Sequence, residues 1–201
     1  MPDEERFQSA ISRFDAANSE DPRKIVFQDI EYPFELLYAQ RMTHWLDRLA
    51  PEASDVLRLA ARSQHICRWQ IPRDSYPMDR AGYHRWRTRL YGFHAEKAGA
   101  ILREVGYDEA SVSRVEQLLQ KKNLKTDPEM QLLEDVICLV FLENYFAEFS
   151  REHEPEQVVG ILRKTWRKMS SQGQKVAVGL DMPAEARRLL DQALSGDPDQ
   201  A

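Results

Sequence analysis

The stretch Val136-Ile-Cys-Leu-Val-Phe-Leu142 is the longest apolar run in this chain of 201 residues. It lies inside a longer apolar segment, Met130 to Phe149, which follows Asp127-Pro128, a capping aspartate and a first-turn proline. The run is far shorter than the roughly 20 apolar residues that a membrane-spanning helix needs. We therefore expect Met130 to Phe149 to form the central buried helix of a globular protein.

The apolar spacing on either side of this segment is also helical. Apolar residues recur at steps of three and four, without the sustained alternation that would indicate a sheet. We expect an all-α, single-domain bundle of about seven to eight helices. The expected helices cover residues 4–17, 33–49, 53–67, 83–105, 108–121, 127–149, 155–166 and 184–194. We expect residues 68–82 and 170–173 to form loops.

The domain organisation follows from these helices. Residues 1–32 read as an N-terminal helix with an irregular lead-in, and residues 33–153 as the helical core. Residues 154–196 read as C-terminal helices, and residues 197–201 as a frayed tail rich in polar residues.

Composition excludes several classes of protein. Hydrophobic residues make up 42% and charged residues 30%, with 8 Gly and 10 Pro, which argues against wholesale disorder and collagen-like repeats. Cys67 and Cys138 lie in apolar helical stretches, as buried thiols of a reducing compartment do. The acidic N-terminus lacks the apolar stretch of a secretory signal. We expect a cytoplasmic protein that does not enter membranes.

Positive charge is concentrated in one segment. The net charge of −5 argues against nucleic-acid binding, but residues 62–89 hold seven arginines against Asp74 and Asp79. Arginine forks suit phosphate or carboxylate oxygens, and aromatic faces suit a base or a sugar. The candidate binding residues for a small anion are Arg68, Trp69, Arg73, Tyr83 and Arg87. The alternative is that these arginines pair with acids elsewhere while the aromatic rings pack the loop.

Three polar residues fall on expected apolar helix faces: His65, His94 and Asp135. Burying them without partners is costly, and two imidazoles with a carboxylate suit a divalent metal ion. Glu96 or Glu134 could add an oxygen ligand or accept a proton as a catalytic residue. The alternative is that each is a core residue satisfied by ordinary hydrogen bonds.

Two stretches resemble the HD-domain superfamily of all-helical, metal-dependent phosphohydrolases. Leu57-Arg-Leu-Ala-Ala-Arg-Ser-Gln-His65-Ile66 is similar to the apolar helix that ends in that family's His-Asp pair, and Leu132-Leu-Glu-Asp135 to its terminal aspartate. The aspartate of the pair is Ile66 here, and Tyr38 replaces the first histidine. The family's metal site and activity therefore do not transfer directly.

A second resemblance covers nearly the whole chain. It rests on Gln64-His-Ile-Cys-Arg-Trp-Gln-Ile-Pro-Arg73, Tyr76-Pro-Met-Asp-Arg-Ala-Gly-Tyr83 and Phe93-His-Ala-Glu96. These stretches are similar to a bacterial and fungal family known only as a domain of unknown function (number 4202). This resemblance implies a fold and a site location, but no reaction.

These observations lead to two functional hypotheses. The first is a metal-dependent hydrolase of a small phosphorylated or otherwise anionic metabolite, in which the metal activates water and loop arginines hold the substrate. The second is a catalytically inactive HD-like protein that binds a small anion, a nucleotide or a partner protein through the same loop. RNA binding ranks last because the chain is acidic, and a homo-oligomer is left open.

Overall fold

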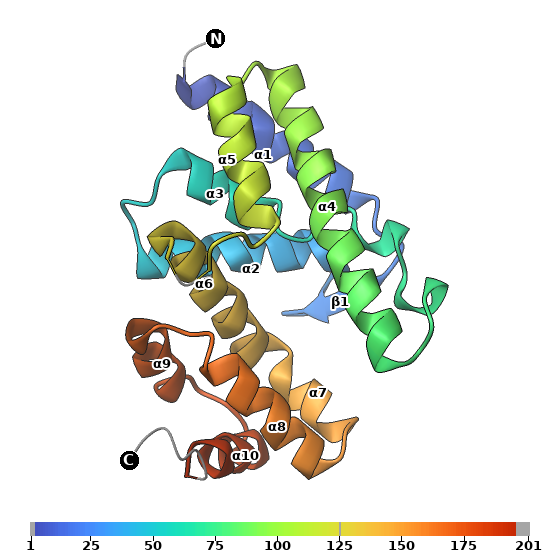
Figure 1. The fold of residues 1–201 in the computed structure, drawn as a ribbon, viewed down its shortest axis with the longest axis vertical. Helices are drawn as coiled ribbons and strands as arrows, with labels where there is room; N and C mark the ends of the chain where they lie inside the picture. The colour runs from blue at the N-terminus through green and yellow to red at the C-terminus, as the bar shows by residue number, and fades with distance from the viewer. Residues whose placement is uncertain (1–2, 125, 196–201) are drawn as a thin grey trace. The chain divides into compact units, whose positions relative to one another are not determined.

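The computed structural model describes residues 3–124 and 126–195 of the chain (Figure 1). The fold is all-α, as expected, apart from one short hairpin. The chain divides into two compact units, residues 1–124 and 125–201, which are described one at a time. We expected a continuous core over residues 33–153, whereas the division falls inside that range.

The first unit packs five helices around one apolar core: α1 (Asp3–Ser19), α2 (Phe34–Leu49), α3 (Asp55–Arg62), α4 (Arg80–Val105) and α5 (Glu109–Leu119). Helices α4 and α5 lie side by side, α3 packs against α2 and α5, and α1 contacts α2, α3 and α4 (Figure 1). Burial of large apolar side chains stabilises this arrangement. Nearly complete burial is seen for Phe14, Trp45, Leu59, Leu102 and Leu118.

A β-hairpin occupies part of the segment that we expected to be irregular. Strands β1 (Lys24–Phe27) and β2 (Ile30–Pro33) pair antiparallel, and the turn residues Gln28 and Asp29 have φ angles of 51° and 63°. Positive φ at both turn positions is typical of tight hairpin turns. The expectation of an irregular lead-in was wrong for this part of the segment. The hairpin was missed because strands of four residues are too short to show a clear alternation and because its turn lacks glycine.

Capping residues set the starts of α5 and α6 (Pro128–Asn144) and the end of α4 as expected, whereas α4 starts at Arg80 rather than at residue 83. Asp79, Asp108 and Asp127 accept hydrogen bonds from backbone N–H groups at the starts of α4, α5 and α6. Gly106 ends α4 with a φ of 90°, the left-handed conformation common after a helix. The helix expected over residues 53–67 is shorter: α3 begins after the capping residue Ser54 and ends at Arg62, followed by turns. The short helices η1 (Arg68–Gln70) and η2 (Arg73–Ser75) come next.

The second unit contains α6 (Pro128–Asn144), α7 (Phe146–Arg151), α8 (Pro155–Trp166), α9 (Ser171–Val178) and α10 (Ala184–Ser195). Helix α6 packs against α7 and α9, and α10 against α7 and α8. The apolar segment is buried along most of α6, but α6 ends at Asn144 rather than at Phe149. Within residues 3–124 and 126–195, no helix combines the length and apolar character that a membrane span requires.

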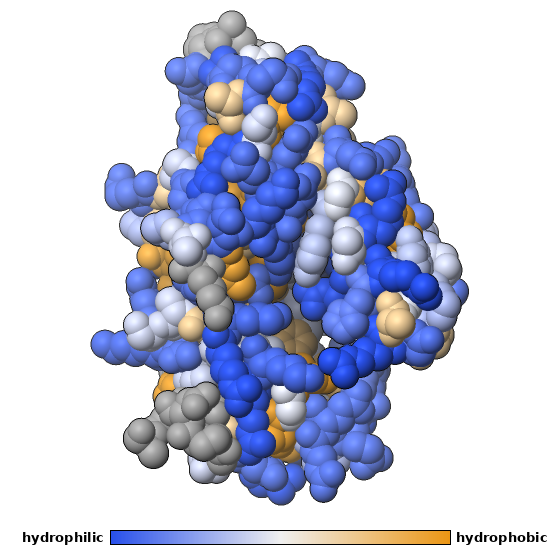
Figure 2. All heavy atoms as spheres, viewed as in Figure 1, coloured by the Kyte–Doolittle hydropathy of each residue, from blue (hydrophilic) through white to orange (hydrophobic). Residues whose placement is uncertain are grey.

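The loop expected over residues 170–173 is instead the start of α9. Ser170 caps this helix by accepting a hydrogen bond from the Gly173 N–H at 3.1 Å. The tail expected over residues 197–201 lies outside the described residues. Figure 2 shows hydrophilic residues over most of the visible face, in keeping with apolar packing inside each unit.

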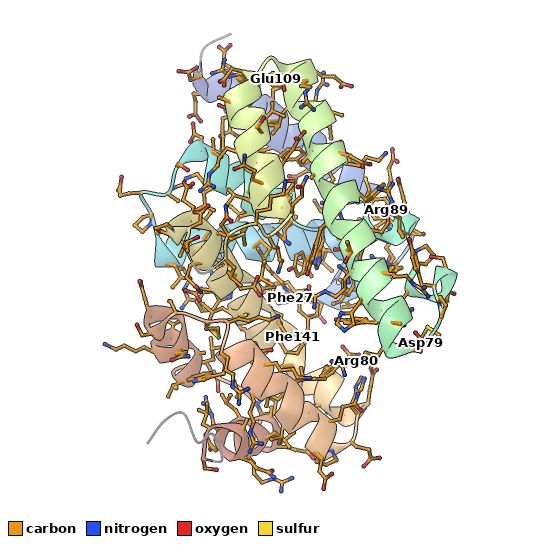
Figure 3. The ribbon with its side chains drawn as sticks, viewed as in Figure 1. Phe27, Asp79, Arg80, Arg89, Glu109 and Phe141 are labelled. Carbon is orange, nitrogen blue, oxygen red and sulfur yellow. The ribbon has the colours of Figure 1, made fainter. Side chains whose placement is uncertain are left out.

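The start of α4 depends on a close approach at Gly82. A β-carbon there would lie 2.0 Å from the backbone oxygen of Pro77, in the loop that leads to Asp79 and Arg80 (Figure 3). We predict that Gly82→Ala lowers the free energy of unfolding by about 1–3 kcal/mol, because backbone must move to relieve the clash. Urea denaturation followed by circular dichroism measures the change.

The matched control for this substitution is Gly92→Ala on the same helix. Its β-carbon would meet only ordinary contacts, at 3.9 and 4.0 Å. We expect it to be neutral or to stabilise by up to about 1 kcal/mol, because alanine favours helix over glycine. Equal stabilities of the two variants would contradict this account of the loop.

Candidate functional site

The segment from His65 to Arg68 is held in place by a strained residue between them. Cys67 has a φ of 53°, a left-handed conformation that is uncommon for a residue other than glycine. Its N–H donates a hydrogen bond to the side-chain oxygen of Asn18 at 3.0 Å, and Ile66 is completely buried beside it. Asn18, at the end of α1, therefore helps to position His65 and Arg68.

His65 is partly exposed and lies next to the buried carboxylate of Glu35. Its ring stacks on Tyr38 of α2, with centroids 4.1 Å apart and planes inclined by 14°. Nδ1 lies 3.4 Å from Oε2 of Glu35, and Nε2 lies 3.2 Å from Nη1 of Arg68. Because a guanidinium only donates, Nε2 is the acceptor and Nδ1 carries the hydrogen that faces Glu35. The His65 side chain is 21% exposed, whereas Glu35 is completely buried.

His94 lies next to His65, with ring centroids 5.8 Å apart. Its Nδ1 is 2.9 Å from the backbone oxygen of Ile66, and its buried Nε2 has no hydrogen-bond partner among the described residues. Burial lowers the pKa of His94 to about 3, and the charge of Arg68 contributes to this shift. The imidazole of His94 is therefore neutral at pH 7.

Positive charge surrounds His65. Burial lowers the pKa of His65 well below its ordinary value, and the charges of Arg68, Lys121, Arg87 and Arg23 lower it further. Arg23 is balanced locally, since its Nη2 lies within 2.8 Å of carboxylate oxygens of two buried acids on neighbouring segments.

Arg68 and Arg87 contact aromatic side chains rather than acids. The Arg68 guanidinium lies over the Trp86 ring, 4.7 Å from its centroid. Arg87 donates hydrogen bonds to the hydroxyls of Tyr83 at 3.3 Å and Tyr91 at 2.5 Å. In the part of the chain that the structure describes, neither arginine lies within ion-pair distance of a carboxylate. Both guanidinium groups can therefore accept an anionic partner.

The other predicted loop residues hold the loop together. Arg73 donates hydrogen bonds to the backbone oxygens of Tyr76 at 3.1 Å and Asp79 at 3.2 Å. Trp69 is half-buried within η1. Arg73 therefore braces the loop, and a contact of Arg73 or Trp69 with a ligand stays a prediction.

The predicted proton acceptors, Glu96 and Glu134, each lie near a basic side chain. Glu96 is exposed on α4 and lies 3.3 Å from Arg89, which Figure 3 labels on the same helix. Glu134 is buried in the second unit, with Oε1 3.7 Å from Nζ of Lys168. Their proposed catalytic roles stay predictions.

Asp135 has a structural role in the second unit. Its carboxylate accepts hydrogen bonds from the N–H of Ser170 at 2.8 Å and from the Ser170 hydroxyl. It also accepts one from the Gln131 amide at 3.2 Å. A β-carbon at Gly173 would lie 2.7 Å from this carboxylate, so Asp135 is packed tightly against the start of α9.

The described residues around His65 do not fit a metal ion. Across residues 3–124 and 126–195, no group of three or more His, Cys, Asp or Glu side chains is arranged to hold one. The cationic side chains near His65 would also repel a divalent cation. Coordination of a metal by His65, His94 and Asp135 stays a prediction.

Sequence reasoning missed two residues of the site, Glu35 and Tyr91. Glu35 precedes Tyr38 by three residues and Met42 by seven, which places it on the inward face of α2 and could have indicated a buried carboxylate. The sequence predicts a solvated helix end for Lys121, with the rim of the arginine-lined site as the alternative. Its position near His65 depends on how α5 packs, for which the sequence carries no signal.

Comparison with known proteins identifies the family. A family model described as Domain of unknown function (DUF4202) matches residues 8–190, which is most of the chain. The chain therefore belongs to this family. No curated protein matches it, and no solved structure matches it. The likeness to the HD-domain superfamily stays a prediction.

The low pKa of His94 predicts a loss of stability in acid. Below an unfolded-state pKa of about 6.5, the unfolded chain binds a proton that folded His94 does not bind, so the free energy of unfolding falls as pH decreases. His94 should account for a loss of about 2 kcal/mol between pH 7 and pH 5. We predict that His94→Asn, which can still donate to the Ile66 oxygen, removes this part of the loss.

Urea denaturation at both pH values tests this prediction, and the measured quantity is the difference between the two free energies. His44→Asn, which replaces an exposed histidine of α2, controls for the loss of an imidazole elsewhere. If His94→Asn loses as much stability between pH 7 and pH 5 as the wild type, the assignment of a neutral, buried His94 is wrong.

Proposed function

We propose that this protein binds a small phosphorylated or otherwise anionic metabolite at the His65 cluster, defined as His65, Arg68, Arg87 and Lys121. The observation that carries the proposal is that Nη1 of Arg68 lies 3.2 Å from Nε2 of the partly exposed His65 imidazole, while the charges of Lys121 and Arg87 also act on this ring. Among the described residues, Arg68 and Arg87 lie beyond ion-pair distance of a carboxylate, although the charge of Arg68 interacts with that of the buried Glu35. A bound anion would relieve the cost of holding these charges together in partly buried surroundings.

The donors of the cluster suit an oxyanion. A guanidinium presents five N–H donors in a planar fork that matches two oxygens of phosphate or carboxylate. Arg87 uses part of this fork on the two tyrosine hydroxyls, which fix its orientation and leave further donors for a ligand. Arg68 donates to the neutral Nε2 of His65, a weaker partner than an anion, so it can turn toward a bound phosphate.

The charges near His65 favour an anion over a divalent cation. Among the described residues, the carboxylate beside His65 is that of Glu35, whose other oxygen lies 2.7 Å from Nη2 of Arg23. A metal ion would therefore add positive charge to an already positive site. Metal-dependent hydrolysis, with Glu96 or Glu134 as the proton acceptor, stays a prediction that the His65 cluster itself does not support.

We predict that the full chain binds inorganic pyrophosphate and that Arg87→Gln weakens this binding about 10-fold to 100-fold. This range corresponds to loss of one charge-assisted hydrogen bond to the ligand. Glutamine keeps a donor for the tyrosine hydroxyls while removing the positive charge. Isothermal titration calorimetry measures both dissociation constants.

Arg89→Gln is the matched control, because Arg89 lies on the same helix but is exposed and paired with Glu96. We expect it to bind pyrophosphate as tightly as the wild type. The proposal is contradicted if the wild type shows no binding, or if the Arg87 and Arg89 substitutions weaken binding equally.

A further inference from the structure

A stripe of alternating aromatic and cationic side chains runs along one face of α4. Tyr83, Arg87 and Tyr91 are spaced four residues apart, so they lie above one another on the helix surface. Arg87 lies between the two rings and donates to both hydroxyls, and Nζ of Lys121 is 5.8 Å from the Tyr91 centroid. We call these four residues the α4 stripe. It spans about 12 Å along the helix axis, from the first tyrosine to the second.

Tyr83 is the exposed end of this stripe. The residue is 40% exposed, whereas the other three residues are half-buried. Its hydroxyl is held by Arg87, and its ring lies 5.9 Å from the Arg73 guanidinium and 6.0 Å from the Trp86 ring. These contacts order the ring, so a planar ligand could stack on it at little cost in conformational freedom.

Arg87 joins this ring to the His65 cluster. Its charge acts on His65, and its Nη1 lies 3.3 Å from the Tyr83 hydroxyl. Tyr83 and Arg87 are one helical turn apart, about 6 Å along the axis. A single small ligand can therefore place an anionic group at the guanidinium and an aromatic ring on Tyr83.

We infer that the ligand of the His65 cluster is a nucleoside phosphate, whose phosphate binds Arg68 and Arg87 and whose base stacks on Tyr83. This inference rests on the proposed function, because it identifies the chemical class of the same anion. Aromatic stacking recognises a base with little regard to its identity, and arginine recognises the phosphate. The net charge of −5 and a stripe with one exposed ring favour a mononucleotide over an RNA strand.

The test compares two ligands that differ only in the base. AMP and ribose 5-phosphate are titrated into the full-length protein by calorimetry, alongside inorganic pyrophosphate. We expect AMP to bind at least about 10-fold more tightly than ribose 5-phosphate, as loss of one stacked base predicts.

Variants at Tyr83 assign this preference to the ring. Tyr83→Leu keeps an apolar side chain but removes the stacking surface, so the two ligands should bind within about two-fold of each other. Tyr83→Phe keeps the ring and should retain the 10-fold preference. Tyr107→Leu is the control, because the Tyr107 ring lies against Arg6, outside the α4 stripe. Circular dichroism confirms that each variant is folded.

The outcomes separate this inference from the proposed function. If pyrophosphate binds but AMP and ribose 5-phosphate bind equally, base recognition is overturned and the anion site stands. If none of the three ligands binds, both are overturned. If a single-stranded oligonucleotide binds more tightly than AMP, with affinity that falls steeply with salt, the ligand is an RNA strand and the inference is wrong.

Discussion

The arrangement of the first unit depends on two completely buried carboxylates, Asp21 and Glu35. Both contact Arg23, with distances of 2.8 and 2.7 Å to its Nη2, and Asp21 also accepts the N–H of Glu35 at 3.1 Å. Buried charges need such partners, and removing one partner is strongly destabilising. Burial raises the pKa of Glu35, while the charges of Arg68 and Arg23 oppose that rise. This network joins the segment before β1 to the start of α2. It extends to His65 because Nδ1 of His65 lies 3.4 Å from Oε2 of Glu35.

The chemistry of the site follows from this placement. Glu35 faces Nδ1 of His65, and the Arg68 guanidinium faces Nε2. Burial and the neighbouring positive charges lower the pKa of His65, so the imidazole is neutral. Arg87 is held by the hydroxyls of Tyr83 and Tyr91. The cluster therefore presents fixed donors and positive charge beside a partly exposed ring, which are the properties of an oxyanion site.

Apolar spacing and capping residues predicted most of the helices. The features that the sequence did not predict depend on contacts between residues far apart in the chain. Capping aspartates such as Asp108 and Asp127 set helix starts through bonds to nearby N–H groups, which the sequence displays directly. The hairpin and α9 are short, and Ser170 bonds to Asp135, which lies 35 residues away. His65 and Arg68 were identified from residue type, but the roles of Glu35 and Lys121 depend on how α2 and α5 pack. Asp135 was expected at a metal site because a buried carboxylate needs partners, and the partners found are hydrogen-bond donors.

The central claim is that the His65 cluster holds an oxyanion, and anomalous diffraction tests it most directly. Crystals grown with tungstate, a tetrahedral dianion, and with Mn²⁺ would locate both ions in one experiment. The account predicts a tungstate within hydrogen-bond distance of Arg68 and Arg87. A manganese ion bound by His65 and His94, with no tungstate at the arginines, would contradict it.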